Sequence, residues 1–212
     1  SGTEILNARR HLARTVSVVE MNGDIVALMR GPYRSFSGDI YHPGYSRVFI
    51  EEGRGYIERT KQSFDLIQIN LLESMSSASA GVYSLNENYL FTTEALEACL
   101  SRLKPEGILS ISRWIKNPPR DNIKLLAMAI EAIEAHGKNA PSLSIIMVRS
   151  WQTATILAKN GTFHHEEIEA VKSFCKSRFF DLCYYPGIRK EETNIFNKLE
   201  KSYFYLAALR LL

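Results

Sequence analysis

The chain lacks the long apolar runs and the strong charge of one sign that would point to a membrane or to nucleic acid. No stretch approaches the roughly 18 apolar residues that a membrane span needs, and no signal peptide is recognisable at its start. The formal net charge is +3, and no cluster of lysine and arginine is long enough to form a basic stripe. We therefore expect a soluble, cytoplasmic protein without a nucleic-acid partner.

Cysteine is scarce, and the motifs of several enzyme classes are absent. The three cysteines, Cys99, Cys175 and Cys183, are widely spaced in apolar surroundings, which favours reduced core thiols over disulfides or a metal site. The sequence has no Gly-x-Ser-x-Gly elbow, no phosphate loop and no His-Glu-x-x-His helix. The pair His164-His165 stands at a predicted helix start, where we expect solvated side chains. We therefore predict no bound metal.

Strand and helix patterns alternate along the 212 residues, of which 45% are hydrophobic. Short apolar runs predict strands at 15–19, 48–50, 64–72, 107–113, 142–148, 153–158 and 181–185. Helical spacing of apolar residues predicts helices at 3–14, 23–30, 53–59, 94–103, 120–136, 166–178 and 194–212, with threonine caps at 92 or 93 and at 162.

This alternation predicts an α/β fold with a mostly parallel sheet, an antiparallel edge hairpin formed by 142–148 and 153–158, and helices on both faces. Both ends look cut, because the first strand has no earlier neighbour and the last helical run has no cap. We expect a domain at 1–160 and a C-terminal helical extension at 161–212 that packs on the same domain.

Acidic residues follow two of the predicted strands. Glu20 ends the run TVSVV, where a carboxylate can accept two hydrogen bonds from a ribose diol in doubly wound folds. A solvated acid near a helix start is the alternative. Glu52, with Gly53, follows the next strand, where its carboxylate can accept from an adenine amino group; a simple charged turn is as good an interpretation. Gly53 and Gly55 do not complete a dinucleotide fingerprint, because Glu58 stands at the third glycine position.

The block from 61 to 114 carries the chemistry. Asn70 and Glu73 stand where the third strand opens into a loop of small residues, and open α/β sheets place their sites at such strand ends. A carboxylate there can hold an amine and take up its proton, although Glu73 can also be a loop acid that points to water. Tyr83, Ser84 and Tyr89 belong to a polar and aromatic cluster suited to lining a pocket, and Tyr89 fits core packing equally well.

At these residues the sequence resembles a known family. The runs VSVVEMNGDIV, EEGRGYI, FDLIQINLLE with AGVYSLNENYLFTTEAL, and LKPEGILSISRW are similar to the spermidine synthase-like (polyamine aminopropyltransferase-like) branch of the class I methyltransferases. The similarity spans most of 2–160 and is most specific from Tyr83 to Trp114. It implies a Rossmann-like class I methyltransferase fold whose first strand and glycine-rich loop are mostly missing at 1–160. Some proteins of this kind are fused to membrane segments.

The resemblance also implies roles for single residues. Gly2 looks like the tail of the glycine-rich loop that receives the methionine part of the cofactor. Glu20 corresponds to the acid that binds ribose, and Glu52 with Gly53 to the adenine contact. The catalytic Asp-x-x-Asp motif is matched only by Asn70 and Glu73, which removes one charge and moves the other carboxylate by one methylene.

These observations predict an enzyme that binds S-adenosylmethionine or decarboxylated S-adenosylmethionine and transfers a methyl or aminopropyl group to a small amine acceptor. Asn70 and Glu73 are the expected catalytic residues, Gly2, Glu20, Glu52, Gly53 and Asn70 the expected cofactor contacts, and Tyr83, Ser84 and Tyr89 the expected acceptor contacts. A homodimer is possible. The alternatives are a non-catalytic regulatory or interaction domain that retains the fold and, lower in rank, an NAD-binding domain that fold analogy alone suggests.

Overall fold

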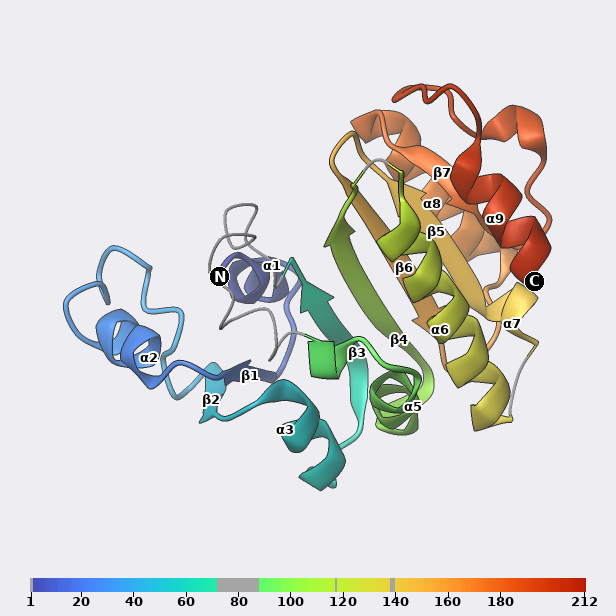
Figure 1. Cartoon of the computed structure of the whole chain (residues 1–212). Coiled ribbons are helices and arrows are strands. Elements are labelled where there is room, and N and C mark those ends of the chain that lie inside the picture. The colour runs from blue at the N-terminus through green and yellow to red at the C-terminus, as the bar shows by residue number, and fades with distance from the viewer. Residues whose placement is uncertain (1, 72–87, 117, 138–139) are drawn as a thin grey trace. The chain divides into compact units, whose positions relative to one another are not determined.

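The computed structural model describes residues 2–71, 88–116, 118–137 and 140–212. The chain forms two compact units, Ser1–Thr60 and Lys61–Leu212, and each contains a β-sheet of its own. Figure 1 labels their helices and strands. The domain boundary that the sequence predicts lies near residue 160 instead, and it stays a prediction.

The unit Ser1–Thr60 alternates helices and strands in the order α1 (Thr3–Arg10), β1 (Val16–Glu20), α2 (Gly23–Arg30), β2 (Ser46–Ile50) and α3 (Gly53–Arg59). The two strands are parallel, with Glu20 opposite Ile50 in the register. Its buried core consists of Ile5, Val26, Ile40 and Tyr41. Because parallel strands end at the same edge of a sheet, Glu20 and the acids that follow β2 lie at one edge.

The unit Lys61–Leu212 contains a five-stranded sheet with the order β3-β4-β6-β5-β7. Its strands are β3 (Phe64–Asn70), β4 (Leu103–Trp114), β5 (Ile145–Arg149), β6 (Thr153–Lys159) and β7 (Asp181–Tyr184). β3 and β4 are parallel, whereas the pairs β4–β6, β6–β5 and β5–β7 are antiparallel. Asn70, at the end of β3, therefore shares one end of the sheet with Trp114, Thr153, Arg149 and Asp181.

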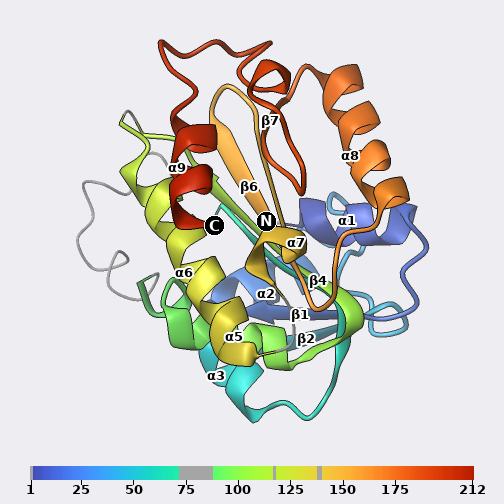
Figure 2. The ribbon, with the colours of Figure 1, turned by 90° about the vertical axis from the view of Figure 1, so that its right-hand side faces the viewer.

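Helices cover both faces of this sheet. They are α5 (Thr93–Ser101), α6 (Arg120–His136), α7 (Pro141–Ser144), α8 (His165–Arg178) and α9 (Tyr203–Leu211), with short 3₁₀ helices η2 (Asn88–Leu90) and η3 (Lys190–Glu192). Figure 2 shows α5, α6 and α9 on one side of the sheet and α8 on the other. Leu109 and Ile111 of β4 and Leu126 of α6 are fully buried, as the alternation of β4 and the amphipathic pattern of α6 require.

The predicted α/β fold with an antiparallel hairpin and helices on both faces is confirmed. The five-stranded sheet is not mostly parallel, because only β3 and β4 run parallel in it, and three local predictions are also wrong. Residues 194–212 are not one helix, because α9 begins only at Tyr203. Thr162 does not cap α8: His164 holds that position, and the Glu167 side chain accepts the His164 backbone N–H. The hairpin is not the edge of the sheet, because β7 pairs with β5 beyond it.

Among the described residues, no helix combines the length and the apolar character that crossing a membrane requires.

Candidate functional site

Glu20 ends β1 with a half-buried carboxylate. Its Oε1 accepts the backbone N–H of Asn22 at 2.9 Å, and Asn22 in turn caps α2 by accepting the N–H of Asp24 at 2.9 Å. Within the described part of the chain, no other group donates a hydrogen bond to this carboxylate. Since a carboxylate has about four lone-pair positions, Glu20 retains the capacity to accept bonds from ligand hydroxyls.

The negative charge of Glu20 acts on Tyr41, a buried residue of the same unit. Burial raises the pKa of Tyr41, and the negative charge of Glu20 raises it further, while Arg30 acts in the opposite direction. Tyr41 is only 5% exposed. The Glu20 carboxylate is therefore near enough to Tyr41 for its charge to act on this buried side chain.

Glu52 is the N-terminal cap of α3. Its Oε1 accepts the N–H of Arg54 at 2.9 Å, and its Oε2 accepts the N–H of Gly55 at 2.8 Å. The neighbouring Glu51 forms an ion pair with Arg59 at 2.6 Å. Gly53 opens the helix. The structure thus gives Glu52 a capping role in the charged turn, and its contact with adenine stays a prediction.

Gly2 precedes α1 and lies close to another part of its unit. A Cβ atom at this position would overlap the Cδ1 atom of Ile40, so any side chain here would displace Ile40. Gly2 also lines an apolar groove of about 510 Å³. The walls come from α1, α2 and the segment 33–40, and include Thr3, Leu6, Ile25, Leu28 and Met29. Glu20 and Glu52 are not part of this lining.

Asn70 is the half-buried last residue of β3. It lies opposite Ser112 in the parallel register with β4, and Ser112 is opposite Thr155 of β6. The hydroxyls of Ser112 and Thr155 form a hydrogen bond of 2.8 Å. Register partners share a face of the sheet, so these three polar side chains form a row across three strands.

The other predicted site residues of this region are placed only in part. Glu73, Tyr83 and Ser84 lie outside the described residues. Tyr89 belongs to η2 and is 58% exposed, so it does not pack in the core. Glu20 and Glu52 belong to one unit and Asn70 to the other. That these residues face one shared crevice therefore stays a prediction.

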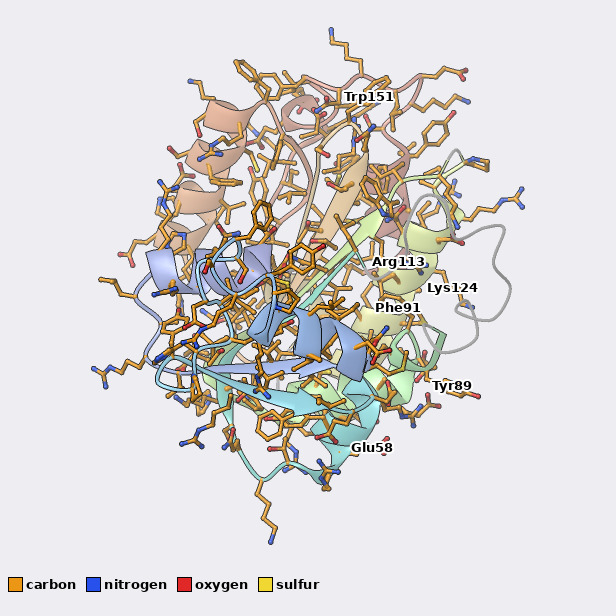
Figure 3. All side chains as sticks on the ribbon, turned by 90° about the vertical axis from the view of Figure 1, so that its left-hand side faces the viewer. Glu58, Tyr89, Phe91, Arg113, Lys124 and Trp151 are labelled. Carbon is orange, nitrogen blue, oxygen red and sulfur yellow. The ribbon has the colours of Figure 1, made fainter. Side chains whose placement is uncertain are left out.

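Sequence reasoning missed Arg113, which lies near the end of β4. Its guanidinium carbon is 4.3 Å from the ring centre of Phe91, and Figure 3 labels both residues. Burial lowers the pKa of Arg113, while the charge of Asp121 acts to raise it. A half-buried cation thus follows Ser112 in β4, with its side chain on the face of the sheet opposite to that of the polar row. The only signal in the sequence was the position of Arg113 at the end of a predicted strand.

No family model matches the chain, but its sequence is similar to those of curated enzymes. The polyamine aminopropyltransferase of Buchnera aphidicola is 23% identical over 203 residues, which cover 93% of this chain and 63% of the relative. The chain thus spans less than two thirds of that enzyme's length.

A solved structure of TM-score above 0.5 shows the same fold. The probable spermidine synthase from Corynebacterium glutamicum matches with a TM-score of 0.55 and 17% identity over 74% of this chain and 52% of its own. The spermidine synthase from Thermotoga maritima matches with a TM-score of 0.47 and 17% identity over 92% of this chain and 56% of its own.

Proposed function

Because the chain is spermidine synthase-like in sequence and fold, we propose that it binds S-adenosylmethionine or its decarboxylated form and transfers an alkyl group to an amine. The similarity to a polyamine aminopropyltransferase over 93% of this chain supports the class of reaction. The observation that carries the proposal is Glu20, a half-buried carboxylate at the end of a parallel strand with acceptor positions to spare.

The surroundings of Glu20 fit a nucleoside. The Asn22 N–H holds Oε1 and fixes the carboxylate in one orientation, so that Oε2 and the remaining lone pairs can accept from the two ribose hydroxyls. Hydrogen bonds to a carboxylate are stronger than those between neutral groups. Glu52 lies after the neighbouring strand, and each of its oxygens accepts one bond, which leaves a lone pair on each for the adenine amino group.

Asn70 and Glu73 supply the proposed chemistry. When bound, the donor supplies a carbon activated by a sulfonium sulfur, and its C–S bond breaks as the acceptor nitrogen forms the new C–N bond. The carbonyl oxygen of Asn70 orients the amine by accepting one of its hydrogens. Glu73 takes up the proton that the nitrogen loses. Positioning and a well-placed base account for most of the acceleration in such a displacement.

Calorimetric titration tests the proposal. S-adenosylmethionine, decarboxylated S-adenosylmethionine and methylthioadenosine are added in turn to the full-length protein. We expect saturable binding of methylthioadenosine and of at least one sulfonium compound. Absence of binding by all three compounds would contradict the proposal.

A non-catalytic domain with the same fold is the second candidate. One observation favours it: Asn70 carries no charge at the position where the family that the chain resembles has an acid. Under this alternative, Glu73→Gln leaves the biological output of the protein unchanged. A loss of output in Glu73→Gln that folds normally supports the enzyme.

A further inference from the structure

An exposed aromatic surface lies at the C-terminal end of α8, which Figure 2 shows on its own side of the sheet. Phe174, Phe179, Ile195 and Phe196 are 49%, 68%, 47% and 40% exposed. We call these four residues the α8-end surface. The rings of Phe179 and Phe196 meet edge to face with their centres 5.6 Å apart, and Phe174 contacts the half-buried Phe180 in the same way at 5.8 Å. Exposed apolar side chains gathered in this way mark interaction sites.

The backbone of Phe179 is strained. It caps α8 with φ 56° and ψ 39°, a left-handed conformation that glycine adopts most readily and a bulky residue adopts at a cost. The side-chain amide of Asn197 donates a hydrogen bond of 2.9 Å to the Phe179 carbonyl and holds this conformation. Because the Phe179 ring is mostly exposed, its packing within the chain offsets little of this conformational strain energy.

The segment that carries Ile195 and Phe196 is also held in place. The buried carboxylate of Asp181 accepts the backbone N–H groups of Ile195 at 2.5 Å, Phe196 at 2.9 Å and Asn197 at 2.8 Å. These bonds fix the backbone of this segment, while the side chains of Ile195 and Phe196 remain exposed to solvent. The α8-end surface is therefore ordered before any partner binds, which lowers the entropy cost of association.

The rim of this surface is basic. The segments 174–180 and 195–200 contain one acidic residue, Glu200, and three basic residues, Lys176, Arg178 and Lys198. All three are exposed, and the guanidinium carbon of Arg178 lies 5.4 Å from the ring centre of Phe174. Two copies of the surface packed face to face would bring like charges together, which disfavours self-association through it.

We propose that the α8-end surface binds a partner polypeptide in which acidic residues surround an apolar anchor. The charge of the rim complements such a segment, and phenylalanine and arginine are enriched in protein interfaces relative to the rest of the surface. A fixed arrangement of rings favours a polypeptide over a lipid surface, which requires no defined geometry. Phe179 lies two residues before Asp181, the first residue of β7, which is opposite Arg149, so a bound partner lies at the same end of the sheet as Asn70.

Selection from a random peptide library tests this inference. A phage-displayed library is selected on the full-length protein and counter-selected on Phe179→Gly. The variant removes the ring and places the residue best suited to the left-handed backbone, so we expect its melting temperature to be equal or a few degrees higher. Enriched peptides are then synthesised, and their affinities for both proteins are measured by fluorescence anisotropy.

The expected result is a set of peptides with net negative charge and an apolar anchor that bind the wild type about tenfold or more tightly than Phe179→Gly. Reversing the rim charge with Lys176→Glu is expected to weaken the same peptides. Enrichment of neutral or basic peptides, equal affinity for the variant, or no enrichment would overturn the inference. Sedimentation with phosphatidylserine vesicles that depends on Phe179 would also overturn it, in favour of a membrane.

Discussion

The guanidinium of Arg149 lies 3.2 Å from the carboxylate of Asp181, and both side chains are buried. This pair joins the end of β5 to the start of β7. Arg149 also donates to the Asn194 side chain at 2.9 Å, while Asp181 accepts three backbone N–H groups of the segment 195–197. The pair therefore organises the chain between β7 and α9.

Asp181→Ala is expected to destabilise the protein strongly. The substitution leaves the Arg149 guanidinium buried without its carboxylate and removes the acceptor of three N–H groups, and breaking such a pair costs about 3–5 kcal/mol. Urea unfolding measures the change in the free energy of unfolding. Asp65→Ala is the control, because its ion pair with Lys104 is at the surface, and we expect little change. Equal stability of the two variants would contradict this role of Asp181.

A second ionic cluster predicts how stability responds to acid. The buried Lys159 ammonium lies 2.8 Å from Glu106 and 2.6 Å from Glu167. Burial by itself raises the pKa of Glu167, but the hydrogen bond and the charge of Lys159, together with the hydrogen bond from the His164 backbone N–H, outweigh it and hold that pKa below its usual value of 4.5. Burial likewise lowers the pKa of Lys159, and its bonds to Glu106 and Glu167 outweigh it and raise that pKa above 10.5.

The sign of the pH effect follows from these directions. The lowered pKa of Glu167 contributes stability that is present above its unfolded value and is lost as the pH falls through its folded value. The raised pKa of Lys159 contributes stability that is lost only as the pH rises through its folded value. We expect Glu167→Gln to be less stable than the wild type at neutral pH and to lose less on acidification. Urea unfolding across the acid range measures the free energy of unfolding of both proteins. An equal loss of stability in the variant and the wild type would contradict this role of Glu167.

The three thiols are expected to be unreactive in the folded protein. Cys99, Cys175 and Cys183 are buried. Burial raises the pKa of Cys99 to about 12 and that of Cys175 to about 11, and raises that of Cys183 as well. Because the thiolate is the reactive form, a thiol reagent should react only after denaturant is added. Rapid reaction of any thiol in the native protein would contradict the described packing.

Much of this arrangement could be predicted from local patterns, and the rest could not. Apolar runs that end in a polar residue located Glu20 and Asn70 at strand ends, because both the run and its end are visible in sequence. The segment after Asn194 reads as helical, yet its backbone N–H groups bind Asp181, which lies 14 residues or more earlier in the chain. The contact of Arg113 with Phe91 also joins separate elements, and spacing alone does not reveal such contacts.

Asn70→Asp tests the proposed acceptor site. The substitution places a carboxylate beside Ser112, at the position where the family that the chain resembles has an acid. A negative charge there attracts the second ammonium group of a diamine, so we expect KM for putrescine to fall by about tenfold, with a smaller effect on a monoamine acceptor. Asn7→Asp, at an exposed position of α1, serves as the control. An unchanged ratio of the two KM values would contradict a role for Asn70 in acceptor binding.

The binding of methylthioadenosine to Glu20→Gln tests the central claim most directly. This nucleoside carries the ribose and adenine without a reactive sulfonium group, so its affinity reports on Glu20 without any chemistry. Loss of a charged acceptor for two hydroxyls is expected to weaken binding by about tenfold to a hundredfold. Glu58→Gln, an exposed acid of the same unit, should bind as the wild type does. Equal affinity of Glu20→Gln and Glu58→Gln would contradict the account.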